Sequence, residues 1–463
     1  MANMPPLTAD IVICGAGIAG IAAAYHLAVR RGIRNILLVD ERPPLSLTSD
    51  KSTECYRNWW PGPGDAMVRL MNRSIDIMEE LAEESGNVFH MNRRGYLFAT
   101  ADPVRIPVFQ RAAGEAAGLG SGPLRVHSGK PENIEYVPAL PQGYEGQPIG
   151  SDLINDRKLI RENFPYLSEE TVALVHPRRC GWVSAQQMGM HLLERAKGKG
   201  VRFHSASVVG VKQGGGRVRT IRLQNGSQSE IVSTRHFVNA AGPFVQNVAA
   251  MLELDLPVFH ELHVKIAFRD PLKIIPREAP LLIWTDPAVL PWSEEERDSL
   301  NQSEETRYLL KEFPSGVHAR PEGGAGSDTV LILWTYDVKT VDPVFPFSVD
   351  PHYPEIALRG LSLIIPGLRA YFGRMTKPVV DGGYYTKTRE NRPLIGPLPI
   401  EGAYIIGGLS GFGIMAACGA GELLAASIAG NDLPPHAAAF SLARYEDPEY
   451  RKLLENWGET GQL

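Results

Sequence analysis

The sequence contains little cysteine: four residues in 463, at positions 14, 55, 180 and 418. They lie far apart and form no CxxC pair, so neither a disulfide framework nor a zinc site is expected. The 12 histidines show no HExxH or similar spacing, and we therefore expect no metal. A reducing compartment, the cytoplasm, is the natural interpretation of this cysteine usage.

A long basic run is also missing. The formal net charge is −5 and the pI is about 6.2, so nucleic-acid binding is not expected. Met1-Ala2-Asn3-Met4-Pro5-Pro6 places no basic segment before an apolar core, and no signal peptide is predicted. The uncharged stretch 404–421 is interrupted by glycines. It favours a buried strand, glycine loop and helix over a membrane span, which needs about 20 apolar residues.

The most informative stretch is residues 10–40. The apolar run Ile11-Val12-Ile13-Cys14 is followed by Gly15, Gly17 and Gly20 in a GxGxxG pattern, then by a small-residue helix and a second apolar run. Gly15 permits a tight turn, Gly17 lets a diphosphate approach the backbone, and Gly20 lets the helix pack closely. The amides that open the helix attract phosphates. This pattern predicts a β-α-β unit that binds a dinucleotide.

The second apolar run ends in a carboxylate, Asp40. Its position is close to the offset of about 20 residues expected for the acid that accepts hydrogen bonds from ribose hydroxyls. Glu41 is the alternative for this contact. Because Asp40 continues the strand directly, we predict that Asp40 makes it.

Periodicity places further elements along the chain. Residues 45–64 form an irregular loop with hydroxyls, Arg57 and paired tryptophans, either a surface loop or a loop over a cofactor ring. Residues 118–149, rich in Gly, Pro and Ser, are predicted as a long insertion, either mobile or a lid, without regular structure. Residues 287–326, charged and rich in Pro and Gly, are predicted as an insertion that forms an excursion on the surface. Helices are predicted at 65–86, 156–164, 185–199 and 419–429, and strands at 95–99, 201–203, 207–211, 234–242, 255–268 and 331–338.

Four stretches occur in an order that resembles the D-amino-acid oxidase superfamily of FAD-dependent oxidoreductases: 15–40, 181–200, 238–242 and 392–421. Within it, the chain is most similar to the monomeric sarcosine oxidase, glycine oxidase and dimethylglycine dehydrogenase group. The resemblance implies an α/β fold. A Rossmann-type FAD-binding domain with a parallel sheet and a β-meander (1–90, 151–255, 376–445) is interleaved with an α+β substrate domain on a mixed, largely antiparallel sheet (91–150, 256–375). Residues 446–463 form a tail.

The resemblance also implies the cofactor and its contacts. Glycine stands at 383, where the sarcosine oxidase has the cysteine that tethers its flavin, and no histidine lies near 52–57, so non-covalent FAD is expected. Val208 or Val209 would bracket the adenine. The implied cofactor-binding residues are Gly15, Gly17, Ile18, Ala19, Gly20, Asp40, Glu41, Ser52, Thr53, Val208, Val209, Ala241, Gly242, Gly411, Phe412, Gly413, Ile414 and Met415.

The activity implied by the resemblance is oxidation of a secondary amine or N-alkyl amino acid by hydride transfer to flavin N5, with dioxygen or an electron carrier as acceptor. The catalytic candidates are Arg57, Lys265 and Tyr385. Arg57 would bind the substrate carboxylate, or pair with Glu54 or solvent. Lys265 would activate dioxygen, or lie on the solvent side of its strand. Met415 matches the carboxylate-binding lysine of the sarcosine oxidase, so sarcosine itself is doubtful as the substrate.

Aromatic residues are the other candidates for the substrate site: Trp59, Trp60, Trp334, Tyr336, Tyr384 and Tyr385. They would cage an alkylated amine through cation–π contacts or simply pack in the core.

Two alternative functions stay open. A 2-hydroxy acid or polyol would need a general base, for which His260 or His263 is available. A flavin-binding assembly protein without turnover is suggested by the two insertions. We further expect that the chain is a monomer or a homo-oligomer that acts on a small-molecule substrate. We expect it to bind no nucleic acid and to contain no transmembrane segment.

Overall fold

The computed structural model of the chain describes residues 7–131, 134–455 and 457. The N-terminal Met1–Pro6 stretch, on which the signal-peptide prediction rests, lies outside the described residues. So does most of the predicted tail beyond α10 (Pro448–Glu455). Among the described residues, no helix combines the length and the apolar character needed to cross a membrane.

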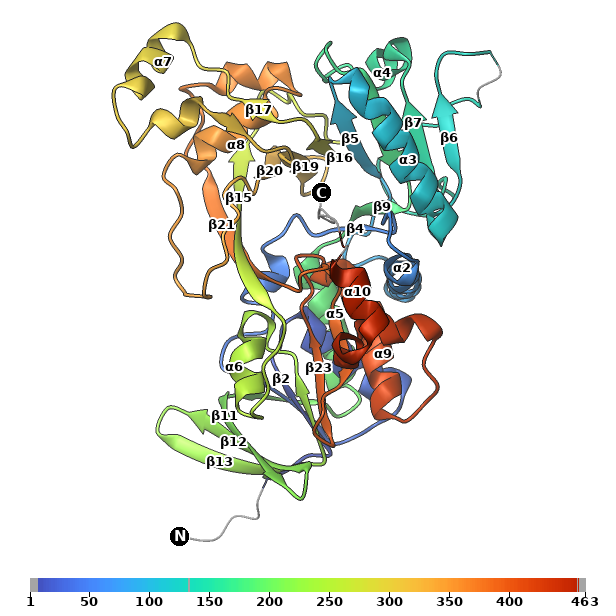
Figure 1. Cartoon of the computed structure of the whole chain (residues 1–463), viewed down its shortest axis with the longest axis vertical. Helices are drawn as coiled ribbons and strands as arrows, with labels where there is room; N and C mark the ends of the chain where they lie inside the picture. Colours follow the sequence, from blue (N-terminus) through green and yellow to red (C-terminus); the bar gives the residue numbers. More distant parts are fainter. Residues whose placement is uncertain (1–6, 132–133, 456, 458–463) are drawn as a thin grey trace.

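Within the described residues, a six-stranded sheet forms the core of the lower half of Figure 1. Its neighbouring strands run parallel except for the last pair. Its β2 and β3 are apolar and almost completely buried, as strands covered on both faces are. In spatial order the strands are β10 (Arg202–Ser205), β3 (Ile36–Asp40), β2 (Ile11–Cys14), β14 (His236–Asn239), β23 (Ala403–Gly407) and β22 (Leu394–Pro397).

A β-meander flanks this sheet at the bottom of Figure 1. Its antiparallel strands are β11 (Ser207–Gly214), β12 (Arg217–Asn225) and β13 (Gln228–Ser233), and β1 (Leu7–Thr8) pairs with β13. The predicted parallel sheet with a meander is thus confirmed.

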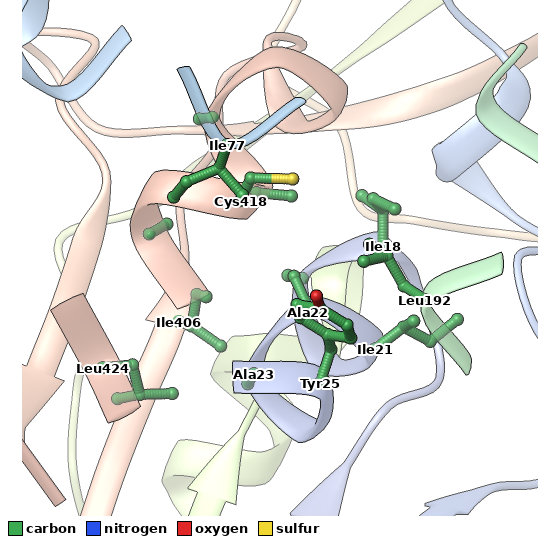
Figure 2. Packing of buried hydrophobic residues seen from close by; sticks show 14 of the residues in the cluster. Ile18, Ile21, Ala22, Ala23, Tyr25, Ile77, Leu192, Ile406, Cys418 and Leu424 are labelled. Carbon is green, nitrogen blue, oxygen red and sulfur yellow. The ribbon is translucent and has the colours of Figure 1, made fainter. Parts of the chain in front are cut away.

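Helices pack closely against the six-stranded sheet. Figure 2 shows side chains of α1 (Ile18–Tyr25) in one buried cluster with Leu192, Ile406 and Leu424. A Cβ at Gly421 would lie 2.9 Å from the Ala22 backbone, so glycine lets α9 approach α1. The other helices of this half are α2 (Ala66–Ser85), α5 (Ala185–Lys197), α6 (Val245–Ala250) and α9 (Gly413–Ile428).

The ends of two helices can be compared with the boundaries predicted from the sequence. Gly86 ends α2 in the left-handed region, with φ of +67°, as its position as the predicted helix stop requires. The predicted start of the last long helix at residue 419 is wrong, because α9 begins at Gly413. Glycines that suggested a loop serve helix packing instead: a Cβ at Gly419 would lie 3.0 Å from the carbonyl oxygen of Leu70 in α2.

The upper half of Figure 1 is built on a nine-stranded sheet of the described residues. It is mixed and largely antiparallel, as predicted. β15 is the long strand that runs down toward the six-stranded sheet (Figure 1). In spatial order the strands are β21 (Val379–Lys387), β15 (Phe259–Arg269), β20 (Thr329–Leu333), β19 (His318–Glu322), β16 (Leu281–Trp284), β5 (Tyr96–Thr100), β8 (Ala173–Pro177), β7 (Ser151–Ile154) and β6 (Leu124–His127).

Both stretches predicted as insertions contain parts of this sheet. Residues 118–149 include β6 at its edge, and 287–326 include β19 in its middle. The prediction of no regular structure at 118–149 is wrong for β6, and the prediction of a surface excursion at 287–326 is wrong for β19, where His318 and Arg320 are buried. The 287–326 stretch also contains β17 (Ala288–Val289), α7 (Glu294–Asn301) and β18 (Glu312–Phe313).

The sheet also bears on the predicted domain limits. β7 and β8 belong to the nine-stranded sheet, although the predicted division gave residues after 150 to the FAD-binding domain. We propose that the substrate domain extends through about residue 177 and includes β21. Its helices are α3 (Ile106–Ala116), α4 (Arg157–Asn163) and α8 (Tyr353–Leu361), and the ribbon β4 (Cys55–Arg57) with β9 (Cys180–Trp182) connects the two halves.

Candidate active site

Three adjoining cavities run between the two sheets. The first has a volume of about 300 Å³, the second about 90 Å³ and the third about 230 Å³. Gly17 and Ser49 line both the first and the second, while Ser52 and Gly411 line both the second and the third. The three cavities therefore form one elongated site.

The first cavity lies at the carboxyl ends of β2, β3 and β14, where parallel sheets of this type bind ligands. Gly15 turns the chain there with φ of +111°, and a Cβ would overlap the carbonyl oxygen of Ala240. The cavity therefore depends on a residue without a side chain. Of the predicted residues, Gly15, Gly17, Asp40, Glu41, Val208, Ala241 and Gly242 line it.

The two acidic candidates differ in their contacts. Asp40 accepts hydrogen bonds from the amides of Ala16 (2.7 Å) and Arg42 (2.9 Å). Glu41 accepts one from the Ser207 hydroxyl at 2.5 Å. Both carboxylates face the cavity, and Asp40 also braces the glycine turn.

Two of the predicted cofactor-binding residues lie outside the three cavities. Gly20 lines none of them, and its role is packing, because a Cβ there would overlap the carbonyl oxygen of Gly15. Val209 lines none of them and is 36% exposed, whereas its neighbour Val208 is buried against the first cavity.

The second cavity joins the start of α1 to the start of α9. Its wall includes Ile18 and Ala19 from α1, and Gly411, Gly413 and Ile414 from the α9 side. Gly411 has φ of +83° and Ser410 φ of +45°, so the chain turns sharply before α9 begins. Two helix N-termini, each with partial positive charge, thus meet one cavity, and the Ile18 amide at the start of α1 donates to the Ser49 hydroxyl at 3.0 Å.

A side chain at position 383 would be crowded. A Cβ on Gly383 would lie 3.1 Å from the Cβ of Lys51 and 3.2 Å from the Cα of Thr48, so both neighbours would have to shift slightly. The residue present is glycine, which has no group that could form a covalent bond to a flavin.

The third cavity is lined by polar and aromatic residues from several strands. Arg57, Trp60, Thr53, Tyr385, Phe412 and Met415 line it, as do four residues that were not predicted for a site: Glu261, Thr335, His318 and Lys387. His263, considered only as a base for hydroxy acids, is the neighbour of Glu261 on the same face of β15. Alternation along β15 was the signal that could have indicated Glu261.

Arg57 is the buried cation of this cavity. It is 5% exposed, and its guanidinium carbon lies 4.5 Å from the centre of the Trp60 ring. Burial lowers the pKa of Arg57, yet a guanidinium stays protonated at any physiological pH. The cavity thus presents a permanent positive charge.

A hydrogen-bonded chain forms the opposite wall. Glu261 Oε2 lies 3.1 Å from His263 Nε2 and accepts a hydrogen bond from Lys387 Nζ at 3.0 Å. His263 Nδ1 lies 2.7 Å from the Thr335 hydroxyl, and its ring stacks on Tyr385 at 3.9 Å. Burial alone would raise the pKa of Glu261, but the bonds from His263 and Lys387 outweigh it and lower this pKa.

The protonation state of His263 follows from these contacts. Burial lowers the pKa of His263, so the imidazole is neutral at pH 7. Because ionised Glu261 only accepts, the ring proton lies on Nε2, and Nδ1 accepts from Thr335.

The remaining catalytic and aromatic candidates lie elsewhere. Lys265 neither lines the third cavity nor faces solvent: it is 8% exposed, and its Nζ donates to the carbonyls of Asp50 and Ser52. The interpretation of Lys265 as a residue on the solvent side of its strand is thus wrong, and the interpretation that it activates dioxygen stays a prediction. Trp59, Trp334, Tyr336, Tyr384 and His260 also do not line the third cavity.

Comparison with known proteins agrees with this geometry. The family described as FAD dependent oxidoreductase (DAO) matches residues 10–427. Human mitochondrial dimethylglycine dehydrogenase is 25% identical over 291 residues, which cover 60% of this chain and 29% of that protein. The rat protein is 25% identical over 279 residues, covering 59% and 28%. The match thus spans less than a third of the length of these relatives.

Solved structures share the fold. L-Proline dehydrogenase from P. horikoshii superposes with a TM-score of 0.72 at 20% identity, over 96% of this chain and 99% of that chain. Glycine oxidase from Bacillus cereus has a TM-score of 0.68 at 16% identity, over 92% and 99%. Iminodiacetate oxidase from Chelativorans sp. has a TM-score of 0.67 at 19% identity, over 93% and 98%.

Proposed function

Because the chain belongs to the DAO family of FAD-dependent oxidoreductases, whose members act on amino acids and amines, we propose that it oxidises a secondary amine or N-alkyl amino acid. The observation that carries this proposal is Arg57, a buried cation between aromatic walls in the third cavity. A guanidinium in such a site pairs well with a substrate carboxylate.

The cofactor would occupy the first and second cavities of the elongated site, next to the substrate in the third. Asp40, Glu41 and Val208 in the first cavity would hold the adenosine, with Gly15, Gly17 and the start of α1 at the diphosphate. Gly411, Gly413 and Ile414 would hold the flavin ring at the start of α9. Bound FAD supplies a hydride acceptor, and the protein's task is to place the substrate C–H bond against it.

Charge and size narrow the substrate class. The third cavity contains two cations, Arg57 and Lys387, against one ionised carboxylate, Glu261. This excess of positive charge favours a substrate that brings a carboxylate and an uncharged amine. The volume of about 230 Å³ suits a small amino acid, since drug-sized ligands occupy about 300–1,000 Å³.

The direct test is anaerobic reduction of the bound flavin. We expect N-alkyl amino acids to bleach the flavin absorption, and the matching amines without a carboxylate to do so far more slowly. Re-oxidation in air then separates an oxidase from a dehydrogenase. If no secondary amine or amino acid in the panel reduced the flavin, the proposal would fail.

A second candidate, oxidation of a 2-hydroxy acid, is favoured by the Glu261–His263 pair in the same cavity. A neutral imidazole held by a carboxylate is a common general base. We rank this candidate second because both ring nitrogens of His263 already have partners, so that proton removal would pass through Thr335. His260, the other candidate base, bonds Thr386 instead.

Replacing His263 with Asn separates the two candidates. For amine oxidation, which needs no strong base, we expect kcat to change less than about fivefold, whereas a lost general base costs about 10²–10⁴-fold. The measurement is the rate of flavin reduction by the best amine and the best hydroxy acid. A large loss confined to the hydroxy acid would favour the second candidate.

The alternative of a flavin-binding assembly protein without turnover loses its support. The two stretches that suggested it contribute β6 and β19 to the nine-stranded sheet, and the family consists of enzymes.

A further inference from the structure

One short segment, residues 48–53, contributes to all three cavities. It begins with the turn η2 (Thr48–Asp50) and leads into β4. Ser49 lines the first and second cavities, Ser52 the second and third, and Thr53 the third. Thr48 also lines the first and second cavities, so four residues with hydroxyl side chains line the proposed cofactor and substrate site from this segment.

Two cations of the nine-stranded sheet hold the carbonyl groups of the same segment. Lys265 in β15 donates from Nζ to the carbonyl oxygens of Asp50 and Ser52, both at 2.8 Å. Arg320 in β19 donates from Nε to the carbonyl oxygen of Thr53 at 2.5 Å. Three carbonyls within four residues are thus drawn toward one sheet.

Both cations are buried, Lys265 to 8% and Arg320 to 1% exposure. Burying a charge costs several kcal/mol unless it is paired and hydrogen-bonded. Arg320 forms an ion pair with Glu322 and stacks over Trp182, and Glu54 lies near enough to both cations to perturb their pKa values. An apolar residue at 265 would remove the Lys265 donor from the carbonyls of Asp50 and Ser52, and one at 320 would leave the Thr53 carbonyl with the weak Cys55 thiol donor at 3.2 Å.

These contacts give Lys265 a structural role that does not depend on chemistry at the flavin. Its ammonium donates to backbone carbonyls, and Lys265 does not line the third cavity. It is not a solvent-facing strand residue. The role that its contacts support is its effect on the segment that it holds.

We propose that Lys265 and Arg320 are positioning residues, which fix residues 50–53 so that the hydroxyls of Ser49, Ser52 and Thr53 face the FAD and substrate cavities. The affinity of the FAD-binding domain for FAD then depends on two cations that the nine-stranded sheet of the substrate domain supplies. The inference rests on the proposed assignment of the three cavities to FAD and substrate.

The test uses Lys265→Met and Arg320→Met in the full chain. Hydrogen exchange of residues 48–54 is measured without FAD, and the FAD dissociation constant is measured by flavin fluorescence. We expect about tenfold faster exchange and about tenfold weaker FAD binding, the effect of losing hydrogen bonds worth about 1–1.5 kcal/mol. Lys265→Arg, which keeps the donors and the charge, should restore most of both.

Lys51→Met is the matched control. Lys51 belongs to the same segment, but its Nζ pairs with the side chains of Asp381 at 2.9 Å and Asp50 at 3.2 Å and not with a carbonyl. We expect both measurements to stay within about twofold of the wild type, as for a half-exposed ion pair between side chains.

The outcomes separate this inference from the proposed function. Unchanged hydrogen exchange in both methionine variants would show that Lys265 and Arg320 do not fix residues 50–53. Faster exchange with unchanged FAD affinity would show that fixing this segment does not position the cofactor site. Failure of amines to reduce the flavin would leave both readouts intact and affect only the substrate assignment. If the methionine variants do not fold, Lys265→Gln is compared with Lys265→Arg, and equal exchange in the two would overturn the proposal.

Discussion

Replacing Arg57 with Met is expected to lower kcat/KM for amino-acid substrates by about 10²–10³-fold. The guanidinium is buried in the third cavity beside Trp60, and truncating one partner of a buried charge pair costs about 2–5 kcal/mol. Each 1.4 kcal/mol corresponds to about a tenfold change. The measurement is the substrate dependence of flavin reduction in stopped flow.

Two controls make this result specific to the carboxylate. Arg57→Lys keeps the charge without the planar fork and should recover only part of the rate. An amine of the same shape without a carboxylate should lose little rate in the Met variant. FAD affinity should stay within about threefold, because Arg57 lines neither the first nor the second cavity. Equal losses for both kinds of substrate would argue that Arg57 supports the cavity wall and binds no carboxylate.

The first cavity could be predicted from the sequence because its parts are close together in the chain. Residues 11–40 contain β2, the glycine turn, α1 and β3. The glycines are needed there for backbone contacts within this short stretch and with the residues beside it. The pairing of β2 with β3 follows from a single crossover. Asp40 therefore lies at the turn that the pattern predicted, and its carboxylate accepts from Ala16 in that turn.

The third cavity could not be predicted in the same way because strands far apart in sequence build it. Glu261 and Lys387 lie on β15 and β21, and their contact depends on the register of two antiparallel strands. Their neighbour His318 lies on β19, within a stretch that was predicted as a surface excursion. Residue type did not help, since a half-buried lysine such as Lys387 and an exposed lysine look alike in a sequence.

Lys265 also shows that contacts between residues far apart in the sequence could not be predicted. Its sequence position on a strand was correct, but its function depends on a loop more than 200 residues earlier, at Asp50 and Ser52. A resemblance to amine oxidases suggested chemistry for this lysine, whereas the geometry gives it backbone carbonyls as partners. Strand position could therefore be predicted, and side-chain partner could not.

Replacing Gly15 with Ala is expected to have the largest effect on the cofactor. Gly15 has φ of +111°, and a Cβ would overlap the carbonyl oxygen of Ala240. Strained backbone costs about 1–3 kcal/mol, and relieving the overlap must move β2 away from β14. We expect the variant to bind FAD at least 100-fold more weakly and to unfold several degrees lower, measured by FAD titration and thermal unfolding.

Gly32 is the matched control because it isolates the effect of backbone conformation. It also has a positive φ, +69°, but a Cβ there would meet nothing within 4 Å. Gly32→Ala should therefore cost only the left-handed penalty of about 1–2 kcal/mol and leave FAD affinity unchanged. If Gly15→Ala lost no more FAD affinity than Gly32→Ala, the turn after β2 would not be the diphosphate site. In that case the β-α-β unit would serve folding alone. The expectation that it binds FAD depends on Gly15, because the absence of a side chain there both allows the close turn onto Ala240 and leaves the first cavity open.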